Sequence, residues 1–385
     1  MTEIVKRFQS IRKLTEKICA PLKVEDHVPQ PTEFVSPPKW HLAHTTWFFE
    51  EFILKKHLKG YKIFHEDFSY MFNSYYNTIG SRVLRTDRGN MTRPSLAEVL
   101  NYRAYVDEYM CELFGGQLEQ DCLGLIEIGL NHEQQHQELL LTDLKFILGN
   151  NALFPVYLEN ASLVNTKNAS MGWVNVPNGV YAVGAPNEGF HYDNEYGRHK
   201  VYLSNFSISK SLVTNGEYLE FIKDSGYSRH ELWLDEGWAW VNQNQIQSPM
   251  YWYMIENRWM NYTLDGLKPI ENEAQLCHVS HYEAAAFAEW KGLRLPTEFE
   301  WEIASELFEW GKRWEHTNSA YLAYPGFKRP KGAVGEYNGK FMMNQMVLRG
   351  ASVATSPNHS SKTYRNFFHP NMQWQFSGIR LAKDE

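Results

Sequence analysis

The sequence predicts an α+β protein with two domains, a four-helix bundle followed by a domain of short strands and loops. The 385 residues suffice for two domains of ordinary size, each with a core of its own. In the first 150 residues apolar side chains recur at helical spacing, whereas from Trp173 onward short apolar runs alternate with Gly, Pro and Asn. We therefore expect domains over residues 1–150 and 173–385, joined by a polar linker over residues 151–172.

The first two helices of the bundle are expected at residues 3–19 and 39–58. The earlier segment is amphipathic, and its apolar stripe comprises Ile4, Phe8, Ile11, Leu14 and Ile18. Five prolines between residues 21 and 38 make a helix unfavourable there. The second helix therefore begins only near Lys39, and an irregular segment over residues 60–93 follows it.

The third and fourth helices are expected at residues 95–113 and 121–148. Ser95 and Glu98 have the spacing of a capping box, and Gly115-Gly116 closes the third helix. The fourth segment contains no proline, and its apolar residues have helical spacing: Leu125, Ile128, Leu139, Leu140, Leu144 and Ile147. Four helices with one long connection predict an up-and-down bundle that carries a functional insertion.

The second domain is expected to consist of short strands and irregular segments. Strand-forming runs occur at residues 173–176, 180–184 and 200–203. Two short helices are expected at residues 215–224 and 282–291, and much of the remainder looks irregular. The sequence contains no internal repeat and no low-complexity tract.

Composition and charge narrow the class of function. The net charge of −7 argues against general binding to nucleic acid or to anionic membranes, because both require a basic surface. No run of about 18 apolar residues is present, and the N-terminal residues lack an apolar signal core. The scattered cysteines favour free thiols in a reducing compartment: Cys19, Cys111, Cys122 and Cys277. We therefore expect a cytoplasmic protein; the sequence indicates no particular oligomeric state.

The fourth predicted helix contains two histidines one turn apart. His132 and His136 lie on one face of that helix, so both imidazoles can converge on one point and form half of a metal site. Such a pair is also common in ordinary polar stripes. Glu133 and Glu138 are candidate acceptors for the free ring N–H groups, and Gln135 could reach a ligand on the metal.

A third ligand must come from another helix. His41 and His44 lie near the start of the second predicted helix, and either could face the interior of the bundle. Because His44 lies among apolar residues, the alternative is a core histidine bonded to a backbone carbonyl. Three histidines without an obligatory carboxylate would leave an octahedral metal with open positions for substrates and oxygen.

Motifs in both halves of the chain have the pattern of one enzyme family. Trp40–His44 and His132–Glu138 resemble the DinB-like metal-binding half of the ergothioneine-biosynthesis sulfoxide synthases. The second half resembles the family's formylglycine-generating-enzyme-like domain, which has a C-type-lectin-like fold. The segments that carry this second resemblance are Tyr192–Glu195, Leu212–Tyr218, Gly292–Glu302, Thr363–Phe368 and Ser377–Ala382.

The resemblance implies an iron-dependent oxidoreductase. In that family three histidines bind non-haem Fe(II), which corresponds here to His44, His132 and His136. The family joins a thiol to imidazole C2 of Nα-trimethylhistidine (hercynine) with O2 as co-substrate, giving a sulfoxide. Three neutral imidazoles leave three positions on the metal, for a thiolate, an imidazole nitrogen and O2.

The resemblance also implies a proton source and substrate-binding residues. In one branch of the family, paired tyrosines of an Asn-Ser-Tyr-Tyr run donate a proton, and this chain has Tyr75 and Tyr76 in such a run. Which of the two donates stays open, and ordinary packing is the alternative for both. Gln135 matches the position that hydrogen-bonds the substrate imidazole. The trimethylammonium group requires aromatic walls, for which the candidates are Phe367, Phe368, Trp374 and Phe376.

One position departs from the pattern of the family. Relatives with paired tyrosines carry an arginine just before the tryptophan, where this chain has Gln373. Glutamine is an uncharged and weaker partner for the carboxylate of the thiol substrate. The arginines that could compensate are Arg82, Arg85, Arg88 and Arg365. The thiol donor therefore stays open between cysteine, which we favour, gamma-glutamylcysteine, and a selenium donor as in selenoneine-forming relatives.

Three other functions use the same features differently. A formylglycine-generating oxidase requires a cysteine pair for copper in the second domain, where only Cys277 is present, and this excludes it. A DinB-like zinc-dependent thiol transferase or hydrolase would use the same three histidines with zinc. A ligand-binding module without catalysis would bind its small molecule with equal affinity after removal of the metal, and the intact set of histidines disfavours it.

Overall fold

The computed structural model describes residues 3–74, 76, 80–159, 166–329 and 338–385, and the chain divides into two compact units. The first unit comprises residues 1–158 together with 354–359, and the second comprises residues 159–353 and 360–385. The division at Leu158 falls inside the segment that the sequence assigns to the linker. The return of residues 354–359 to the first unit has no counterpart among the sequence-based expectations.

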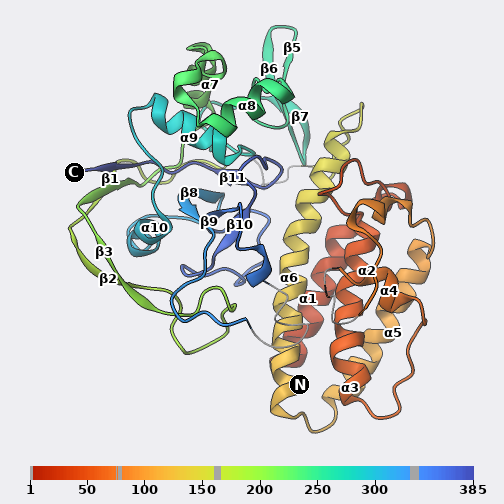
Figure 1. Cartoon of the computed structure of the whole chain (residues 1–385). Coiled ribbons are helices and arrows are strands. Elements are labelled where there is room, and N and C mark those ends of the chain that lie inside the picture. The colour runs from red at the N-terminus through yellow and green to blue at the C-terminus, as the bar shows by residue number, and fades with distance from the viewer. Residues whose placement is uncertain (1–2, 75, 77–79, 160–165, 330–337) are drawn as a thin grey trace. The chain divides into compact units, whose positions relative to one another are not determined.

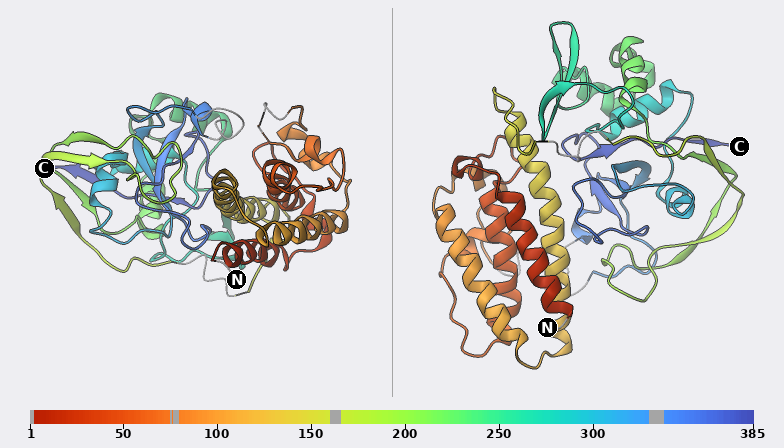
Figure 2. Two further views of the ribbon diagram at one scale, coloured as in Figure 1. Left: turned by 90° about the horizontal axis from the view of Figure 1, so that it is seen from below. Right: turned by 180° about the vertical axis from the view of Figure 1, so that it is seen from behind.

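The first unit is a four-helix bundle, as the sequence predicts. Its long helices run side by side (Figure 1 and Figure 2): α1 (Glu3–Cys19), α2 (Pro38–Phe49), α5 (Leu96–Phe114) and α6 (Gln120–Gly149). A π-helical segment (Glu50–Leu54) joins α2 to α3 (Lys55–His57), and the connection to α5 contains α4 (Phe68–Phe72). Val24–His27 and Arg85–Asn90 form 3-10 turns.

Helix α2 lies at the centre of the bundle, because every one of its residues is buried. It packs against both α5 and α6. Gly129 of α6 permits the close approach, since a Cβ atom there would meet Phe49 Cε1 at 2.9 Å and Phe48 Cε1 at 3.1 Å. The two helices that carry the histidine motifs are thereby held next to each other.

Buried charges tie α1, α5 and α6 together. Glu133 of α6 accepts hydrogen bonds from Arg12 Nη1 at 2.9 Å, Arg103 Nη2 at 2.5 Å and Thr15 Oγ1 at 2.6 Å. Burial opposes ionisation of this carboxyl, but the charges of Arg103 and Arg12 outweigh it and lower the pKa of Glu133 to about 2. Glu133 is thus an ionised structural group, and its oxygens are not directed at the neighbouring His132.

Segment 354–359 completes the first unit by packing on α6. Thr355 Oγ1 donates to Glu138 Oε2 at 2.8 Å, and the Ser356 hydroxyl donates to Gln137 Oε1. These contacts involve the turn of α6 that directly follows His136.

The second unit contains small sheets rather than one large one. Within the described residues the strand orders are β1–β4–β12, β10–β9–β8–β11, β2–β3 and β5–β6–β7. All pairs are antiparallel except β8 with β11. The strands are β1 (Trp173–Val176), β2 (Gly179–Val183), β3 (His199–Leu203), β4 (Phe206–Ser209), β5 (Trp252–Ile255), β6 (Arg258–Thr263), β7 (Gly266–Pro269), β8 (Trp314–Ala320), β9 (Met346–Gly350), β10 (Asn366–Phe368), β11 (Ser377–Gly378) and β12 (Ala382–Asp384).

In the part of the second unit that the structure describes, four α-helices interrupt these strands: α7 (Asn215–Lys223), α8 (Asp235–Asn244), α9 (His281–Trp290) and α10 (Glu298–Ala304). Helices α7 and α9 occupy the two segments that the sequence predicts to be helical. Helices α8 and α10 lie where the sequence looks irregular. With seven residues, α10 is too short to display a helical period, although Thr297 and Glu300 form a capping box at its start.

Buried ion pairs join the elements of the second unit. Each pair places an arginine guanidinium against a carboxylate at 2.5–2.8 Å, and the pairs are Arg365–Glu298, Arg349–Glu302 and Arg380–Glu315. A buried pair of this kind is costly to break, because the remaining charge has no compensation. Several of these residues lie in the motifs that carry the family resemblance, which therefore reflects the fold of this unit.

No helix in the described part of the chain is long and apolar enough to cross a membrane. The cysteines are free thiols, as their scattered positions predict: Cys19, Cys111, Cys122 and Cys277.

Candidate metal centre

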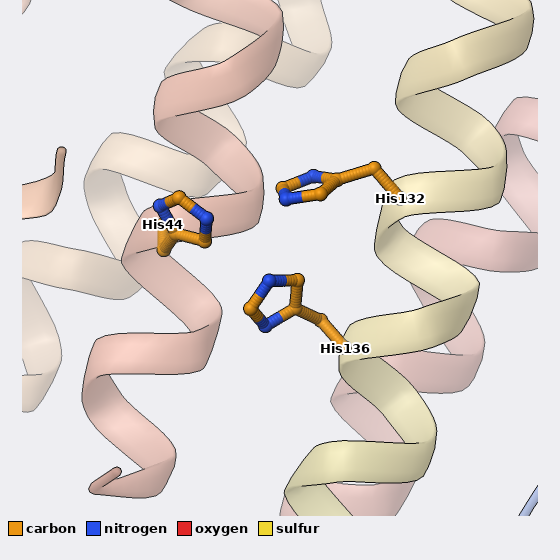
Figure 3. Close-up of side chains that lie close together, drawn as sticks. All are labelled: His44, His132 and His136. Carbon is orange, nitrogen blue, oxygen red and sulfur yellow. The ribbon is translucent and has the colours of Figure 1, made fainter. Parts of the chain in front are cut away.

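Three histidines from two helices of the first unit converge on one point. His44 comes from α2, and His132 and His136 come from α6 (Figure 3). Their candidate ligand nitrogens all lie within 4.8 Å of one another. The ring centroids are 4.6–4.9 Å apart in all three pairs. A cluster of three imidazoles at this spacing can hold one metal ion.

Contacts on both faces of the ring fix the orientation of His44. Its imidazole lies between Trp40, with centroids 4.4 Å apart, and Trp47, with centroids 5.4 Å apart, and is nearly parallel to both. Its Nδ1–H donates to the carbonyl oxygen of Phe72 at 2.6 Å. The other nitrogen, Nε2, is buried and has no hydrogen-bond partner among the described residues. A buried nitrogen without a partner is unfavourable, and a metal ion bound to Nε2 would remove this cost.

The cluster favours neutral imidazoles, which is the form that binds metals. Burial, followed by the proximity of His132, lowers the pKa of His44 well below its usual value. Burial also lowers the pKa of His132 to about 3. A set of three neutral nitrogen donors suits Fe(II) and zinc alike, so the residues fit the metal that the family resemblance implies.

His41 lies beside the cluster and contacts His136. The Nδ1 atoms of His41 and His136 are 2.9 Å apart, and His41 Nε2 is 3.0 Å from Asp143 Oδ2. Of the two candidates on α2, the structure thus brings His44 into the cluster and places His41 behind His136. Asp143 is a residue that the sequence-based search missed. Its position seven residues after His136 puts it on the same helix face, which is the signal that could have found it.

The two tyrosines of the Asn-Ser-Tyr-Tyr run differ in what can be said of them. Tyr75 lies outside the described residues. Tyr76 is fully buried, and its ring centroid is 5.6 Å from that of Trp47, which in turn stacks on His44. Tyr76 N donates to Asn73 Oδ1 at 3.1 Å, and Asn73 Nδ2 donates back to the carbonyl of Tyr76. Tyr76 is therefore held one ring away from a member of the cluster.

Among the loop arginines, Arg88 is the buried one. Its guanidinium carbon lies 3.4 Å above the Trp40 ring, whose stacking partner is His44. It donates to Ser36 Oγ at 2.8 Å and to Ser74 Oγ at 3.0 Å, and no carboxylate among the described residues forms an ion pair with it. Burial, followed by the charge of Arg85, lowers the pKa of Arg88 well below its usual value.

The other predicted residues of this unit lie near the surface. Arg82 is half-buried, and Arg85 is exposed and donates to the carbonyl of Phe34. Gln135 is half-buried on α6 between the two histidines.

The aromatic candidates of the second unit differ in their packing partners and in burial. Phe367 stacks on Tyr321 with centroids 4.0 Å apart. Phe368 meets Trp374 edge to face at 5.1 Å. Trp374 and Phe376 are buried, whereas Phe367 and Phe368 are half-buried.

The polar residues near Trp374 and in the preceding motif differ in their hydrogen-bond partners. Gln373 Nε2 donates to the buried Glu283 at 2.8 Å. The guanidinium of Arg365 is paired with Glu298, so its charge is already compensated. Gln375 is 2% exposed, and neither atom of its amide has a partner among the described residues. The sequence-based search named both of its neighbours but missed Gln375 itself.

Known protein families match the two halves of the chain separately. Residues 7–140 match the DinB superfamily, and residues 160–323 match the sulfatase-modifying factor enzyme 1-like domain. Both matches agree with the fold that the sequence predicts.

Curated proteins are similar to different shares of this chain. Hercynine oxygenase of Mycolicibacterium smegmatis is 29% identical over 311 residues, which cover 66% of this chain and 70% of that protein. Hercynine oxygenase of Mycobacterium tuberculosis is 26% identical over 352 residues, which cover 78% and 81%. The formylglycine-generating enzyme of Streptomyces coelicolor is 30% identical over 162 residues, which cover only 37% of this chain and 51% of that protein.

Proposed function

We propose that this chain is an iron-dependent hercynine oxygenase. Its two parts match the DinB superfamily and the sulfatase-modifying factor enzyme 1-like domain, and it is similar to hercynine oxygenases over most of its length. It would form a carbon–sulfur bond between a thiol and imidazole C2 of hercynine, giving a sulfoxide in ergothioneine biosynthesis. In this reaction the C2–H and S–H bonds are lost, and O2 supplies the sulfoxide oxygen and one water. The observation that carries the proposal is the cluster of His44, His132 and His136 in a chain with both family domains.

His44, His132 and His136 are the proposed ligands of Fe(II). Bound there, Fe(II) would supply open positions for both substrates and O2 together with the redox chemistry. The protein holds the imidazoles ready: Trp40, Trp47 and the Phe72 carbonyl fix His44 in one orientation. The two histidines of α6 are fixed by their spacing on one helix face.

Tyr75 and Tyr76 are the proposed proton source. Tyr76 supports this role by its burial and by its packing on Trp47, which keeps it in the neighbourhood of His44. A phenol in a site closed to water can hold its proton until an acceptor forms beside it.

The carboxylate of the thiol substrate is proposed to bind the loop arginines. Arg88 supports this most strongly, because its buried guanidinium donates to the neutral hydroxyls of Ser36 and Ser74, forms no ion pair within the described residues, and stacks on Trp40 beside the cluster. Arg82 and Arg85 on the same loop would add positive charge. Gln373 would assist by keeping Trp374 in place, since its amide is bound to Glu283.

Gln135 and four aromatic side chains are proposed to bind hercynine. Gln135, on α6 between the two ligand histidines, would hydrogen-bond the imidazole. The faces of Phe367, Phe368, Trp374 and Phe376 would accommodate the trimethylammonium group, which has no N–H to donate.

The test is an aerobic assay with Fe(II) and hercynine, in which cysteine, gamma-glutamylcysteine and a selenium donor are offered in separate reactions. Products are identified by mass spectrometry while O2 consumption is recorded. We expect a sulfoxide adduct, with cysteine as the preferred donor. Iron-loaded protein that forms no adduct with any donor contradicts the proposal. Protein that is isolated with zinc and consumes no O2 would favour the zinc-dependent thiol transferase, because the same three histidines suit zinc.

A further inference from the structure

A histidine has two ring nitrogens, and only one of them can bind a given metal ion. Which nitrogen is free depends on the partner of the other one. For His44 the partner is the carbonyl of Phe72, which can only accept a hydrogen bond, so Nδ1 carries the proton and Nε2 is left for the metal. For His136 Nδ1 the hydrogen-bond partner among the described residues is His41 Nδ1.

The proton positions along this contact follow from Asp143. A carboxylate accepts hydrogen bonds and cannot donate one, so His41 Nε2, which lies 3.0 Å from Asp143 Oδ2, must carry the proton. A neutral His41 then has a lone pair at Nδ1. Because His41 Nδ1 lies 2.9 Å from His136 Nδ1, His136 must donate there. His136 Nε2 is consequently unprotonated and free to bind a metal.

The carboxylate of Asp143, at the end of this series of hydrogen bonds, is itself held in place. Asp143 is 1% exposed, and its Oδ2 also accepts the backbone N–H of Ser36 at 2.9 Å. Ser36 Oγ in turn accepts a hydrogen bond from Arg88. The carboxylate is thus anchored by main chain from outside the helices, and it cannot turn away from His41 without losing two hydrogen bonds.

We propose that Asp143 and His41 are positioning residues of the metal centre, which act through a buried Asp143–His41–His136 relay that selects Nε2 of His136 as the ligand. The inference rests on the three-histidine metal site of the proposed function and is independent of the substrate. A merely structural role, in which the pair only ties α2 to α6, would affect folding and leave metal affinity unchanged once the protein is folded.

Co(II) binding to the full-length apoprotein separates these two roles. We expect His41→Phe and Asp143→Leu to raise the Kd for Co(II) by about 10–100-fold, the usual cost of losing an outer hydrogen-bond partner of a ligand histidine. The visible absorption bands of bound Co(II) should shift as well. Asp143→Asn is the conservative control, because an amide oxygen at the position of Oδ2 can still accept from both His41 and Ser36; we expect its Kd to change less than about threefold.

Circular dichroism of each apoprotein shows whether the variant is folded. Folded His41→Phe protein that binds Co(II) with unchanged affinity and an unchanged spectrum overturns the proposal. Should both disruptive variants fail to fold, the wild-type protein decides. In its zinc-bound form, ¹⁵N NMR of labelled histidines should show His136 protonated at Nδ1, with its signals assigned through a His136→Gln variant. Protonation at Nε2 overturns the proposal.

The outcome is distinguishable from failure of the proposed function. If wild-type protein binds Co(II) through the relay but forms no sulfoxide, the relay holds and the proposed reaction fails. If the wild-type protein binds neither Co(II) nor Fe(II), the relay is overturned together with the metal site.

Discussion

Arg88 carries a buried positive charge that forms no ion pair with a carboxylate among the described residues. If it binds the carboxylate of the thiol substrate, Arg88→Gln removes a charge-assisted hydrogen bond worth about 2 kcal/mol, and KM for the thiol should rise roughly 30-fold. KM for hercynine should change much less. The kinetics are measured with each substrate varied in turn. The exposed Arg93→Gln variant is the matched control, and equal effects of the two variants on the thiol would refute this role of Arg88.

The buried carboxyl group of Glu283 in the second unit predicts how the stability of that unit depends on pH, independently of the metal centre. This buried carboxyl accepts hydrogen bonds from Tyr227 and Gln373, and burial raises its pKa from 4.5 to about 6. Because the pKa is raised in the folded state, folding favours the protonated form of Glu283. Its contribution to the free energy of unfolding is therefore complete below pH 4.5 and is lost as the pH rises through about 6. The shift corresponds to about 2 kcal/mol.

Glu283→Gln removes this titration. Relative to the variant, the wild-type protein should lose about 2 kcal/mol of unfolding free energy between pH 4.5 and pH 7. Hydrogen exchange of the second unit, measured in both proteins across this range, checks the prediction. A difference that stays constant with pH would show that Glu283 is ionised throughout or that its pKa is ordinary.

At the scale of residues, the sequence predicts the three clustered histidines better than the partners of those histidines. His132 and His136 are visible because four-residue spacing on a helix is a local property, and the family motif adds His44. Asp143 reaches His41 on another helix, and the buried amide of Gln375 has no partner among the described residues, so neither can be recognised without the folded structure. The sequence also suggests Glu133 as a partner of the histidines, whereas Arg12 and Arg103 bind it.

The close approach of α2 and α6 determines whether three histidines can meet. A Cβ atom at Gly129 would lie 2.9 Å from a carbon of Phe49, so Gly129→Ala should force the helices apart and cost about 1–3 kcal/mol. It should also weaken metal binding. Gly124→Ala on the same helix is the control, because nothing lies within 4 Å of its added Cβ, and it should stabilise the helix by up to about 1 kcal/mol.

Thermal unfolding and Co(II) titration of both alanine variants measure these effects. Equal stability and equal Co(II) affinity of the two variants would mean that helix separation does not control the site.

At the scale of elements, the long helices follow closely from the sequence, because caps and apolar periods are local signals. The helix expected at residues 3–19 coincides with α1, and the capping box at Ser95 and Glu98 starts α5. Most strands of the second unit cannot be predicted from such local signals. They are short, β11 having two residues, and several are buried on both faces and so show no alternation.

The division into two units predicts where a metal stabilises the molecule. A metal that binds only the folded first unit adds about 2.7 kcal/mol to its stability at a concentration 100 times the Kd. Adding Co(II) to the apoprotein should therefore slow hydrogen exchange in α2 and α6, while exchange in the sheets of the second unit changes less. A chelator should reverse the effect. Uniform protection of both units would contradict a site confined to the bundle.

At the scale of the whole molecule, the two-domain organisation follows from the change in sequence pattern near residue 150. The membership of residues 354–359 in the first unit does not. This placement depends on contacts such as that of Thr355 with Glu138, which are 217 residues apart. A local sequence pattern cannot predict a contact between residues so far apart.

The most direct measurement is sulfoxide formation by wild-type protein and by His44→Ala, His132→Ala and His136→Ala, each supplied with Fe(II), O2, hercynine and cysteine. Iron content is determined for the same samples after anaerobic purification. We predict that the wild-type protein binds one iron and forms the sulfoxide with consumption of O2, and that each variant loses iron and product together. A variant that keeps both its iron and its activity would contradict the three-histidine centre on which the proposed function depends.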